Sequence, residues 1–401
     1  MRTNANQKVH KPKRDPYRVM LRLTGILAII VVVGLGVFFG CRYLIESEYL
    51  TTVSRVEQAN AEGKMEFDAR MSTLRNNTAA QLDPDTGEIT VRELGTWEKA
   101  IDGVQWRVSE EAAAAPENTR VITVERNALL LGGMMLVNAW HALPDVYFTS
   151  QVESELVSIG NASNWKIAAR NANVRVYPVA YDALAAALTD ATAQELKYYT
   201  AWEGYRTNDD QSALFTARAE KLSGKYSGDT LIQETKKYVN YPGTSEYQTG
   251  MSFILRLYDS KDAAVNNLVY QKSDQVKWFT SNSWKYGLIF RFPTKDFPNS
   301  AWEDKSYKTG ISTEMNLYRY VGKAHAAAMT VMGLCLEEYV EFLLQHPHFS
   351  IYADDALQYE VYRIPSDMAS ESYDLVVPNP AGDYQASFDN MGGIVMAYAY
   401  N

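Results

Sequence analysis

A run of nineteen uncharged residues near the N-terminus, Leu23 to Cys41, sets the first limit on how this 401-residue chain folds. At about 1.5 Å per helical residue the run is roughly 28 Å long, close to the ~30 Å hydrocarbon core of a bilayer. Seven basic residues and one acidic residue precede it. The positive-inside rule then predicts a cytoplasmic tail over residues 1–22, a transmembrane helix over residues 23–44, and a location outside the cell membrane for everything that follows.

A cleaved signal peptide is the alternative for the same segment. The apolar core of a signal peptide is about 7–15 residues long and ends in small residues. Here the uncharged run is longer, and it ends in Phe38-Phe39-Gly40-Cys41, which fits a lipoprotein cleavage site poorly. The sequence therefore favours an uncleaved single-pass anchor.

The remainder of the chain is acidic. Residues 1–22 carry a net charge of +6, so the rest carries −15 against a total of −9. A strongly acidic outer part disfavours nucleic acid and anionic lipid as its partners. With 46% hydrophobic residues, the chain is also long enough to bury a sizeable core in one or two domains.

Patterns along the chain predict its organisation. Residues 45–82 are polar with a thin apolar stripe and predict a helical stalk, and residues 83–87 read as a turn. Residues 88–91 and 104–108 alternate like short strands. Helical spacing appears in 181–193, 209–222, 271–284 and 325–344, whereas 286–292, 351–352, 359–363 and 393–400 read as strands. The prediction is an α+β fold with a stalk and small β-containing linker region over residues 45–118, a main domain over 119–348 and a β-rich extension over 349–401.

Four short segments carry a recognisable motif. Residues 203–207 read Glu-Gly-Tyr-Arg-Thr, 245–254 read Ser-Glu-Tyr-Gln-Thr-Gly-Met-Ser-Phe-Ile, 284–293 read Trp-Lys-Tyr-Gly-Leu-Ile-Phe-Arg-Phe-Pro, and 314–322 read Glu-Met-Asn-Leu-Tyr-Arg-Tyr-Val-Gly. In this order they resemble the VanY-type D-alanyl-D-alanine carboxypeptidases, which belong to the LAS zinc peptidases. The matching family segments read Gly-Tyr-Arg-Ser, Ser-Glu-His-Gln-Thr-Gly-Leu-Ala-Val-Asp, Trp-Lys-Tyr-Gly-Phe-Ile-Leu-Arg-Tyr-Pro and Glu-Pro-Trp-His-Phe-Arg-Tyr-Val-Gly.

The resemblance implies a fold and a set of site positions. It implies a small antiparallel sheet with helices, in a bacterial cell-envelope protein that acts on peptidoglycan stem peptides ending in D-Ala. Arg206, Gln211 and Ser245 match substrate-binding positions, and Glu314 matches the catalytic base. The family has three zinc ligands, His, Asp and His. The matching positions in this chain are Tyr247, Ile254 and Leu317, in that order.

The residue types at those three positions argue against a zinc site. A catalytic zinc needs three protein ligands and an open position for water. Ile254 and Leu317 offer no lone pairs, and Tyr247 alone does not hold the metal. Without zinc, water keeps its pKa of about 15.7, so Glu314 has no activated water to deprotonate. We therefore predict that zinc, the cofactor of the family, is lost here and that Glu314 is a vestigial base.

Other catalytic chemistries find little support in the sequence. The chain has five histidines, and none has a metal-binding partner within the motifs. His325 follows the Tyr-Val-Gly segment and is predicted to be structural. No Ser-x-x-Lys with companion motifs and no Gly-x-Ser-x-Gly is present. Arg206 has an alternative interpretation, in which it pairs with Glu314 or Glu246 to hold the former site together.

Three functional hypotheses follow. The first is a membrane-anchored, wall-facing pseudoenzyme that binds peptidoglycan stem peptides or envelope proteins without cleaving them. The second is an active D,D-carboxypeptidase with an atypical metal site. The third is an envelope scaffold that acts through its stalk.

Overall fold

The protein is described by a computed structural model that covers most of the chain. It describes residues 31–43, 94–111, 119–149, 152–378 and 383–400, together with Tyr17, Met20, Thr24 and Leu27 and the backbone of Ala80–Leu82 and Ile89–Val91. The chain divides into two compact units, Met1–Glu66 and Phe67–Asn401.

In the N-terminal unit, residues 31–43 form a helix whose side chains are exposed. Among the residues that the structure describes, no helix is both long enough and apolar enough to cross a membrane. Most of the predicted cytoplasmic tail, most of the predicted stalk, and the linker over residues 112–118 lie outside the described residues.

The end of the predicted helical stalk is a strand, so the stalk prediction is wrong there. Strand β1 (Ala80–Leu82) pairs antiparallel with β2 (Ile89–Val91). The turn and the second strand were predicted from the sequence, and pairing with that strand accounts for the extended conformation of residues 80–82.

The first large sheet of the C-terminal unit has five strands. Their order is β11 (Leu288–Phe290), β12 (Leu317–Tyr320), β10 (Ser252–Leu257), β9 (Tyr199–Glu203) and β7 (Ala168–Ala169). All neighbours are antiparallel except β7 and β9, which are parallel. The small antiparallel sheet implied by the family resemblance is therefore present, with one parallel edge strand.

The second large sheet has six strands and joins distant parts of the sequence. Their order is β16 (Tyr384–Phe388), β17 (Gly393–Ala399), β14 (Ala356–Pro365), β13 (His348–Ala353), β4 (Val104–Ser109) and β3 (Thr96–Ile101). Strands before residue 118 thus pair with strands after residue 347. The predicted domain boundaries at 118/119 and 348/349 stay predictions, but the segments on their outer sides share one sheet.

Two further two-stranded ribbons and the helices complete the unit. The ribbons are β5 (Thr119–Glu125) with β15 (Ser372–Pro378), and β6 (Val157–Ser158) with β8 (Arg175–Val176). The α-helices are α2 (Arg126–Leu130), α3 (Asp145–Thr149), α4 (Ile159–Ala162), α5 (Pro178–Ala193), α6 (Asn208–Leu222), α7 (Gly228–Lys236), α8 (Ala263–Asn266), α9 (Asp274–Asn282), α10 (Ser306–Thr309), α11 (Lys323–Met332) and α12 (Leu336–Gln345). The 3-10 helices are η1 (Val152–Glu155), η2 (Glu246–Thr249), η3 (Tyr270–Lys272) and η4 (Ser283–Tyr286).

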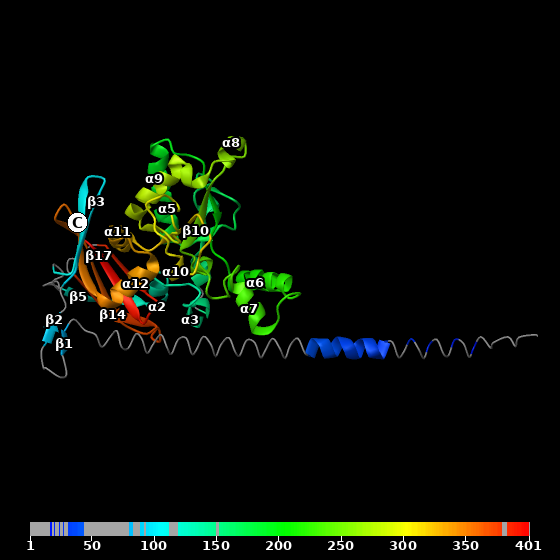
Figure 1. The fold of residues 1–401 in the computed structure, drawn as a ribbon. Coiled ribbons are helices and arrows are strands. Elements are labelled where there is room, and N and C mark those ends of the chain that lie inside the picture. Colours follow the sequence, from blue (N-terminus) through cyan, green and yellow to red (C-terminus); the bar gives the residue numbers. More distant parts are fainter. Residues whose placement is uncertain are drawn as a thin grey trace, which may run out of the picture. The chain divides into compact units, whose positions relative to one another are not determined.

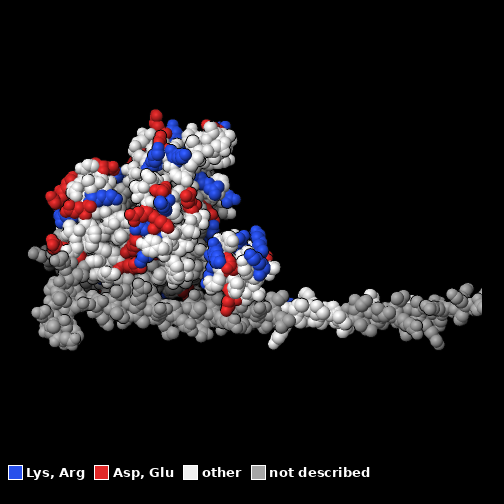
Figure 2. Space-filling model, in the orientation of Figure 1, with Lys and Arg blue, Asp and Glu red and all other residues white. Residues whose placement is uncertain are grey.

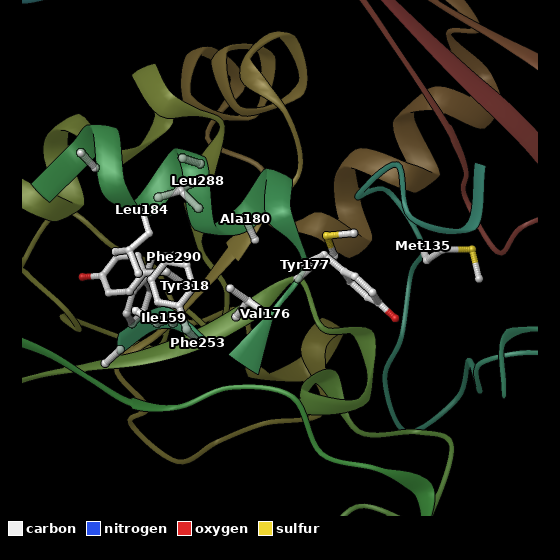
Figure 3. Packing of buried hydrophobic residues seen from close by; sticks show 14 of the residues in the cluster. Met135, Ile159, Val176, Tyr177, Ala180, Leu184, Phe253, Leu288, Phe290 and Tyr318 are labelled. Carbon is white, nitrogen blue, oxygen red and sulfur yellow. The ribbon is translucent and has the colours of Figure 1, made fainter. Parts of the chain in front are cut away.

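Helix α5 covers one face of the five-stranded sheet. Its small and branched residues, Ala180, Leu184 and Ala187, are buried in one cluster with Phe253 from β10 and Tyr318 from β12 (Figure 3). Because side chains alternate along β10 and β12, the rings of Phe253 and Tyr318 lie on the face of the sheet that α5 covers. The residues between them, among them Ile254 and Leu317, therefore face the other side of the sheet.

Strand β17 is buried on both faces, which explains its unbroken apolar sequence. Ile394, Met396 and Tyr398 belong to the same core as α5, whereas Val395 and Ala397 pack with α11 and α12. A strand buried on both sides reads as a continuous apolar run rather than an alternating one. Helix α11 contacts both β17 and β11, and so it lies between the two large sheets (Figure 1).

The sequence left open whether residues 325–344 form one helix or two, and the structure has two. Gly333 stands directly after α11 with φ of 68°, a left-handed conformation that glycine adopts without a Cβ penalty. Helix α12 then begins with Cys335 as its N-cap and with Glu338 accepting a hydrogen bond from the Cys335 N–H at 3.0 Å. The helix predicted over residues 271–284 is likewise divided, into η3, α9 and η4, and Ser273 caps α9.

Candidate functional site

The structure brings together the three positions that correspond to the family's zinc ligands. Ile254 in β10 and Leu317 in β12 are directly opposite each other in the antiparallel register. Tyr247, in η2, is buried with Leu317 and Phe292 in a small cluster against which Ile254, Ile311 and Met315 pack. We call these six residues the apolar cluster. Positions far apart in the sequence thus meet at one place, as the ligands of a metal site must.

The turn that places Tyr247 over the sheet depends on a glycine. Gly250 follows η2 with φ of 64°. A Cβ at this position would lie 2.5 Å from the ring of Tyr177. Both the left-handed backbone and the close approach of the ring require glycine. The Gln248 side chain, which is buried, fixes the loop further by accepting a hydrogen bond from Gly243 N at 2.7 Å.

Arg206 lies over Tyr247. Its Cζ is 3.8 Å from the centroid of the tyrosine ring, and its backbone N–H donates to the Tyr247 carbonyl at 3.0 Å. The guanidinium donates to Glu203 through Nε at 2.7 Å and to Gln211 Oε1 at 3.2 Å. Gln211 in turn donates to the Asn240 carbonyl at 2.7 Å. The carboxylate partner of Arg206 is therefore Glu203, and the pairing with Glu314 or Glu246 considered from the sequence is not observed.

The two remaining predicted positions differ in exposure. Ser245 is buried, and its carbonyl accepts a hydrogen bond from Gln248 N at 2.9 Å at the start of η2. Glu314 is exposed, and its Oε2 accepts a hydrogen bond from Gln271 in η3 at 3.4 Å. Met315, the next residue, packs against the apolar cluster. The structure thus groups Arg206, Gln211 and Ser245 around η2, and directs Glu314 to the surface.

A buried ion network, which the sequence motifs did not reveal, supports this site. Glu246 accepts from Arg291 Nε at 2.9 Å and from Arg319, and Glu337 accepts from Arg291 NH2 at 2.7 Å. Ser252 Oγ also donates to Glu246 at 2.6 Å. All four charged side chains are at most 5% exposed. The network joins η2, the end of β11, β12 and α12.

Backbone carbonyls complete the network. Arg319 NH2 donates to Gly133 O at 2.7 Å and to Met135 O at 3.0 Å, and Arg291 NH2 donates to Val137 O at 3.2 Å. One signal in the sequence pointed to these arginines: each interrupts an otherwise apolar or aromatic strand, where a charge persists only if it is paired.

His325 has the structural role predicted for it. It is fully buried in α11, and its Nδ1 lies 2.9 Å from the Tyr339 hydroxyl in the core between the helices and the six-stranded sheet. Burial lowers the pKa of His325 to about 3, so the ring is neutral at physiological pH.

The side chains at the three ligand positions do not suit zinc. Ile254 and Leu317 have no donor atoms, and burial, followed by the charge of Glu203, raises the pKa of Tyr247 well above neutrality. Without a bound metal, Tyr247 is therefore a neutral phenol, and it is the one side chain of the three that carries a donor atom. Across the described ranges, no group of three or more His, Cys, Asp or Glu side chains is arranged to hold a metal ion. The carboxylates of Glu246 in η2 and of Glu203 are already paired with arginines.

The fold and the convergence of these positions define a mixed α/β domain of the zinc-carboxypeptidase type. Residues 173–323 match the family model described as VanY, D-alanyl-D-alanine carboxypeptidase. The chain belongs to this family.

Individual relatives agree with this assignment. A D-alanyl-D-alanine carboxypeptidase of Enterococcus faecium is 23% identical over 288 residues, covering 71% of this chain and 81% of the relative. The protein YodJ of Bacillus subtilis (strain 168) is 30% identical over 208 residues, covering 52% of this chain and 67% of YodJ. Among solved structures, the vancomycin resistance D,D-dipeptidase VanXYg, in complex with a D-Ala-D-Ala phosphinate analogue, has a similar fold. Its TM-score is 0.52 at 24% identity, over 70% of this chain and 99% of that chain.

The ion network generates a prediction about stability and pH. Burial opposes the ionisation of Glu246, but Arg319 and Arg291, with the Ser252 hydrogen bond, outweigh it and hold the pKa of this carboxyl below its ordinary 4.5. Glu246 thus contributes stability that is present above pH 4.5 and is lost as the pH falls through the lower folded-state pKa. The substitution Glu246→Gln should lower the free energy of unfolding near pH 7 by about 3 kcal/mol, because it leaves two buried arginines short of a charge partner.

Urea denaturation across pH 3–7 measures both effects. The variant should also lose less stability than the parent protein as the pH falls below 4.5. Glu220→Gln, an exposed change on α6, is the control and should alter the free energy of unfolding by less than about 0.5 kcal/mol. A Glu246→Gln protein as stable as this control would show that the network does not hold the site.

Proposed function

We propose that this chain is a non-catalytic member of the VanY family that binds cell-wall peptides ending in D-Ala-D-Ala without cleaving them. The observation that carries the proposal is the apolar cluster: Tyr247, Ile254 and Leu317 meet where the family resemblance requires three zinc ligands. Filling a polar metal pocket with apolar side chains removes the cost of leaving it empty. The polar half of the site, with Arg206 and Gln211, is retained beside the cluster.

The peptide as ligand is supported by the names of relatives. A protein of Enterococcus faecalis that is 28% identical over 225 residues is named a D-alanyl-D-alanine carboxypeptidase, as is the protein from Enterococcus faecium. Arg206 has one guanidinium face on Tyr247 and is 20% exposed. Its Nε and Nη2 already donate to Glu203, and its Nη1 donates to Gln211. The second hydrogens on Nη1 and Nη2 are the donors left for a peptide carboxylate. An envelope protein as partner, and a scaffold that acts through the stalk, remain rival proposals.

The other rival is an active D,D-carboxypeptidase with an atypical metal site, which the names of these relatives favour. The chemistry of the three side chains opposes it, since neither isoleucine nor leucine binds a metal. Metal content and D-Ala release distinguish the two proposals.

We predict that the purified outer part, residues 45–401, carries no stoichiometric zinc and releases no D-Ala from a pentapeptide ending in D-Ala-D-Ala. Elemental analysis and a D-Ala assay, with excess zinc added in a parallel reaction, provide the measurement. Stoichiometric zinc with turnover would refute the non-catalytic proposal.

The triple variant Tyr247→His, Ile254→Asp, Leu317→His tests the same proposal in the opposite direction, by restoring the three ligand types of the family. It should bind zinc and gain thermal stability when zinc is added, because a metal that binds only the folded state stabilises it. Tyr247→His alone, with one donor, is the matched control and should not bind zinc stoichiometrically. A triple variant that folds but neither binds zinc nor gains thermal stability when zinc is added would mean that the three positions do not form the ancestral metal site.

Arg206 generates a second prediction. Arg206→Gln should weaken binding of the pentapeptide at least about tenfold in isothermal titration, because a charged hydrogen-bonding partner of the carboxylate is lost. Arg107→Gln is a matched control, since Arg107 also lies over a tyrosine (4.3 Å from the ring of Tyr352) and also pairs with a carboxylate, that of Asp355. Equal losses in the two variants, or no peptide binding by the parent protein, would contradict peptide recognition by Arg206.

Membrane anchoring through residues 23–44, with the main domain facing the cell wall, is also part of the proposal. It is supported by the uncharged run and by the basic residues before it. The full chain should sediment with membranes and resist extraction by high salt and carbonate, whereas a chain starting at residue 45 should be released. Recovery of the full chain in the soluble fraction would count against an anchor.

A further inference from the structure

A second arrangement of arginines on an aromatic ring lies close to Arg206 and Tyr247. The Cζ of Arg256 is 4.4 Å from the ring centroid of Trp202, and the Cζ of Arg170 is 5.3 Å from it. Both arginines are exposed, and Trp202 is half-buried. We call these three residues the Trp202 platform. No residue of it was singled out by the sequence motifs.

A β-bulge explains how Trp202 comes to support the arginines. Ile254 pairs with Glu203, but the next residue of β10, Leu255, pairs with Ala201, so Trp202 is an extra residue in β9. A bulge redirects the side chain of the extra residue and raises the local twist. Arg256, two residues after Ile254 on the same strand, has its side chain on the same face of the sheet as Ile254. The platform therefore continues the face that carries the apolar cluster.

The charges of the platform are not neutralised by the residues that the structure describes. Among the described residues, no carboxylate forms an ion pair with Arg170 or Arg256, in contrast to Arg206 and Arg107. The chain as a whole has a net charge of −9. On the face drawn in Figure 2, acidic and basic side chains are interspersed. Two arginines that share one tryptophan, with no acidic partner among the described residues, thus form a local cationic site on an acidic protein.

A buried hydroxyl beneath the platform also lacks a partner. Thr200 is directly opposite Arg256 in the β9–β10 register, so its side chain is on the same face. Thr200 is 3% exposed, and its Oγ1 makes no hydrogen bond to any described group. An unmade hydrogen bond of this kind is costly in a folded protein. A ligand oxygen beside Arg256 would offer Thr200 an acceptor.

We infer that the Trp202 platform binds a second carboxylate, that of an acidic side chain on the same peptide whose C-terminus is held at Arg206. The inference rests on the proposed peptide binding. It adds that an acidic side chain of the peptide is a second group that the protein binds. At about 3.4 Å per residue, Arg256 is roughly 7 Å along β10 from Ile254, which packs in the same cluster as Tyr247, the ring on which Arg206 lies. A peptide held at Arg206 therefore has to extend only a few residues along this face to bring an acidic side chain to Arg256.

A peptide carboxylate fits the platform better than a polyphosphate. A guanidinium matches a single carboxylate in a bidentate geometry. A polyanion would have to pass Glu203, which is 32% exposed next to Arg206, and would be repelled by the acidic protein as a whole. A polyphosphate binds through many cations along its length, and the platform has two.

The test is a double-mutant cycle between peptide and protein, measured by isothermal titration. The peptides are pentapeptides ending in D-Ala-D-Ala that carry glutamate at the first, second or third position, each compared with its glutamine counterpart. The proteins are the parent chain, Arg256→Gln, and Arg107→Gln as the matched control. The parent and the control should bind one of the three glutamate peptides about fivefold more tightly than its glutamine counterpart. Arg256→Gln should abolish this difference and leave the affinity for the glutamine peptide unchanged.

The outcomes separate the two proposals. Equal binding of glutamate and glutamine peptides by the parent chain would overturn the second carboxylate site and leave peptide binding by Arg206 intact. Binding of neither peptide would overturn both. An oligomer of glycerol phosphate that binds more tightly than the peptides, and loses affinity in Arg256→Gln, would also overturn the inference, because the platform would then serve a phosphate polymer. High salt should reduce the preference for glutamate, since exposed charge pairs are screened.

Discussion

The buried network of Glu246, Glu337, Arg291 and Arg319 is the interaction on which the site depends. It holds η2 against β11, β12 and α12, and it ties all of them to the segment 133–137 through backbone carbonyls. Charges buried to this degree are tolerated only when each is paired and hydrogen-bonded, so the geometry of the four side chains is tightly constrained. Because Glu246 is the residue before Tyr247, the same constraint fixes the position of Tyr247 over the sheet.

This network also joins the elements that carry the three positions aligned with the family's zinc ligands. In a catalytic zinc site the metal itself cross-links the elements that carry its ligands. Here η2, β10 and β12 are joined by the contacts of Glu246 with Ser252 and Arg319. The pair Ser252 and Arg319 lies two residues along the strands from Ile254 and Leu317, on the same face of the sheet. The apolar cluster then adds burial of Leu317 and Tyr247. A chain supported in this way has no structural need for zinc, which is consistent with the proposed loss of catalysis.

Much of the fold could be predicted from the sequence, and the reasons for the failures are physical. Helices α5 and α6 and strands β4, β13, β14 and β17 follow from local periodicity, and the family motifs located Arg206 and the three ligand positions. The pairing of β4 with β13 was not predictable, because no local signal specifies a partner 241–247 residues away. The ion network and the Trp202 platform were missed for the same reason. Arg291 finds its partners only through tertiary contacts, and Trp202 meets Arg256 only through a bulge.

Tyr247 stands at the boundary between two halves of the site with opposite character. It packs with Leu317 and Phe292 in the apolar cluster, and the guanidinium of Arg206 lies over its ring. A histidine that ligates zinc would present a charged metal to this arginine, whereas a neutral phenol ring attracts the cation through its π face. Under the proposed loss of zinc, a tyrosine at this position would therefore also give Arg206 a surface to lie on. Arg206 is 20% exposed over the ring of Tyr247, which is the physical reason to propose a ligand there. The same principle applies at Trp202, where Arg256 comes from β10 and Arg170 directly follows β7.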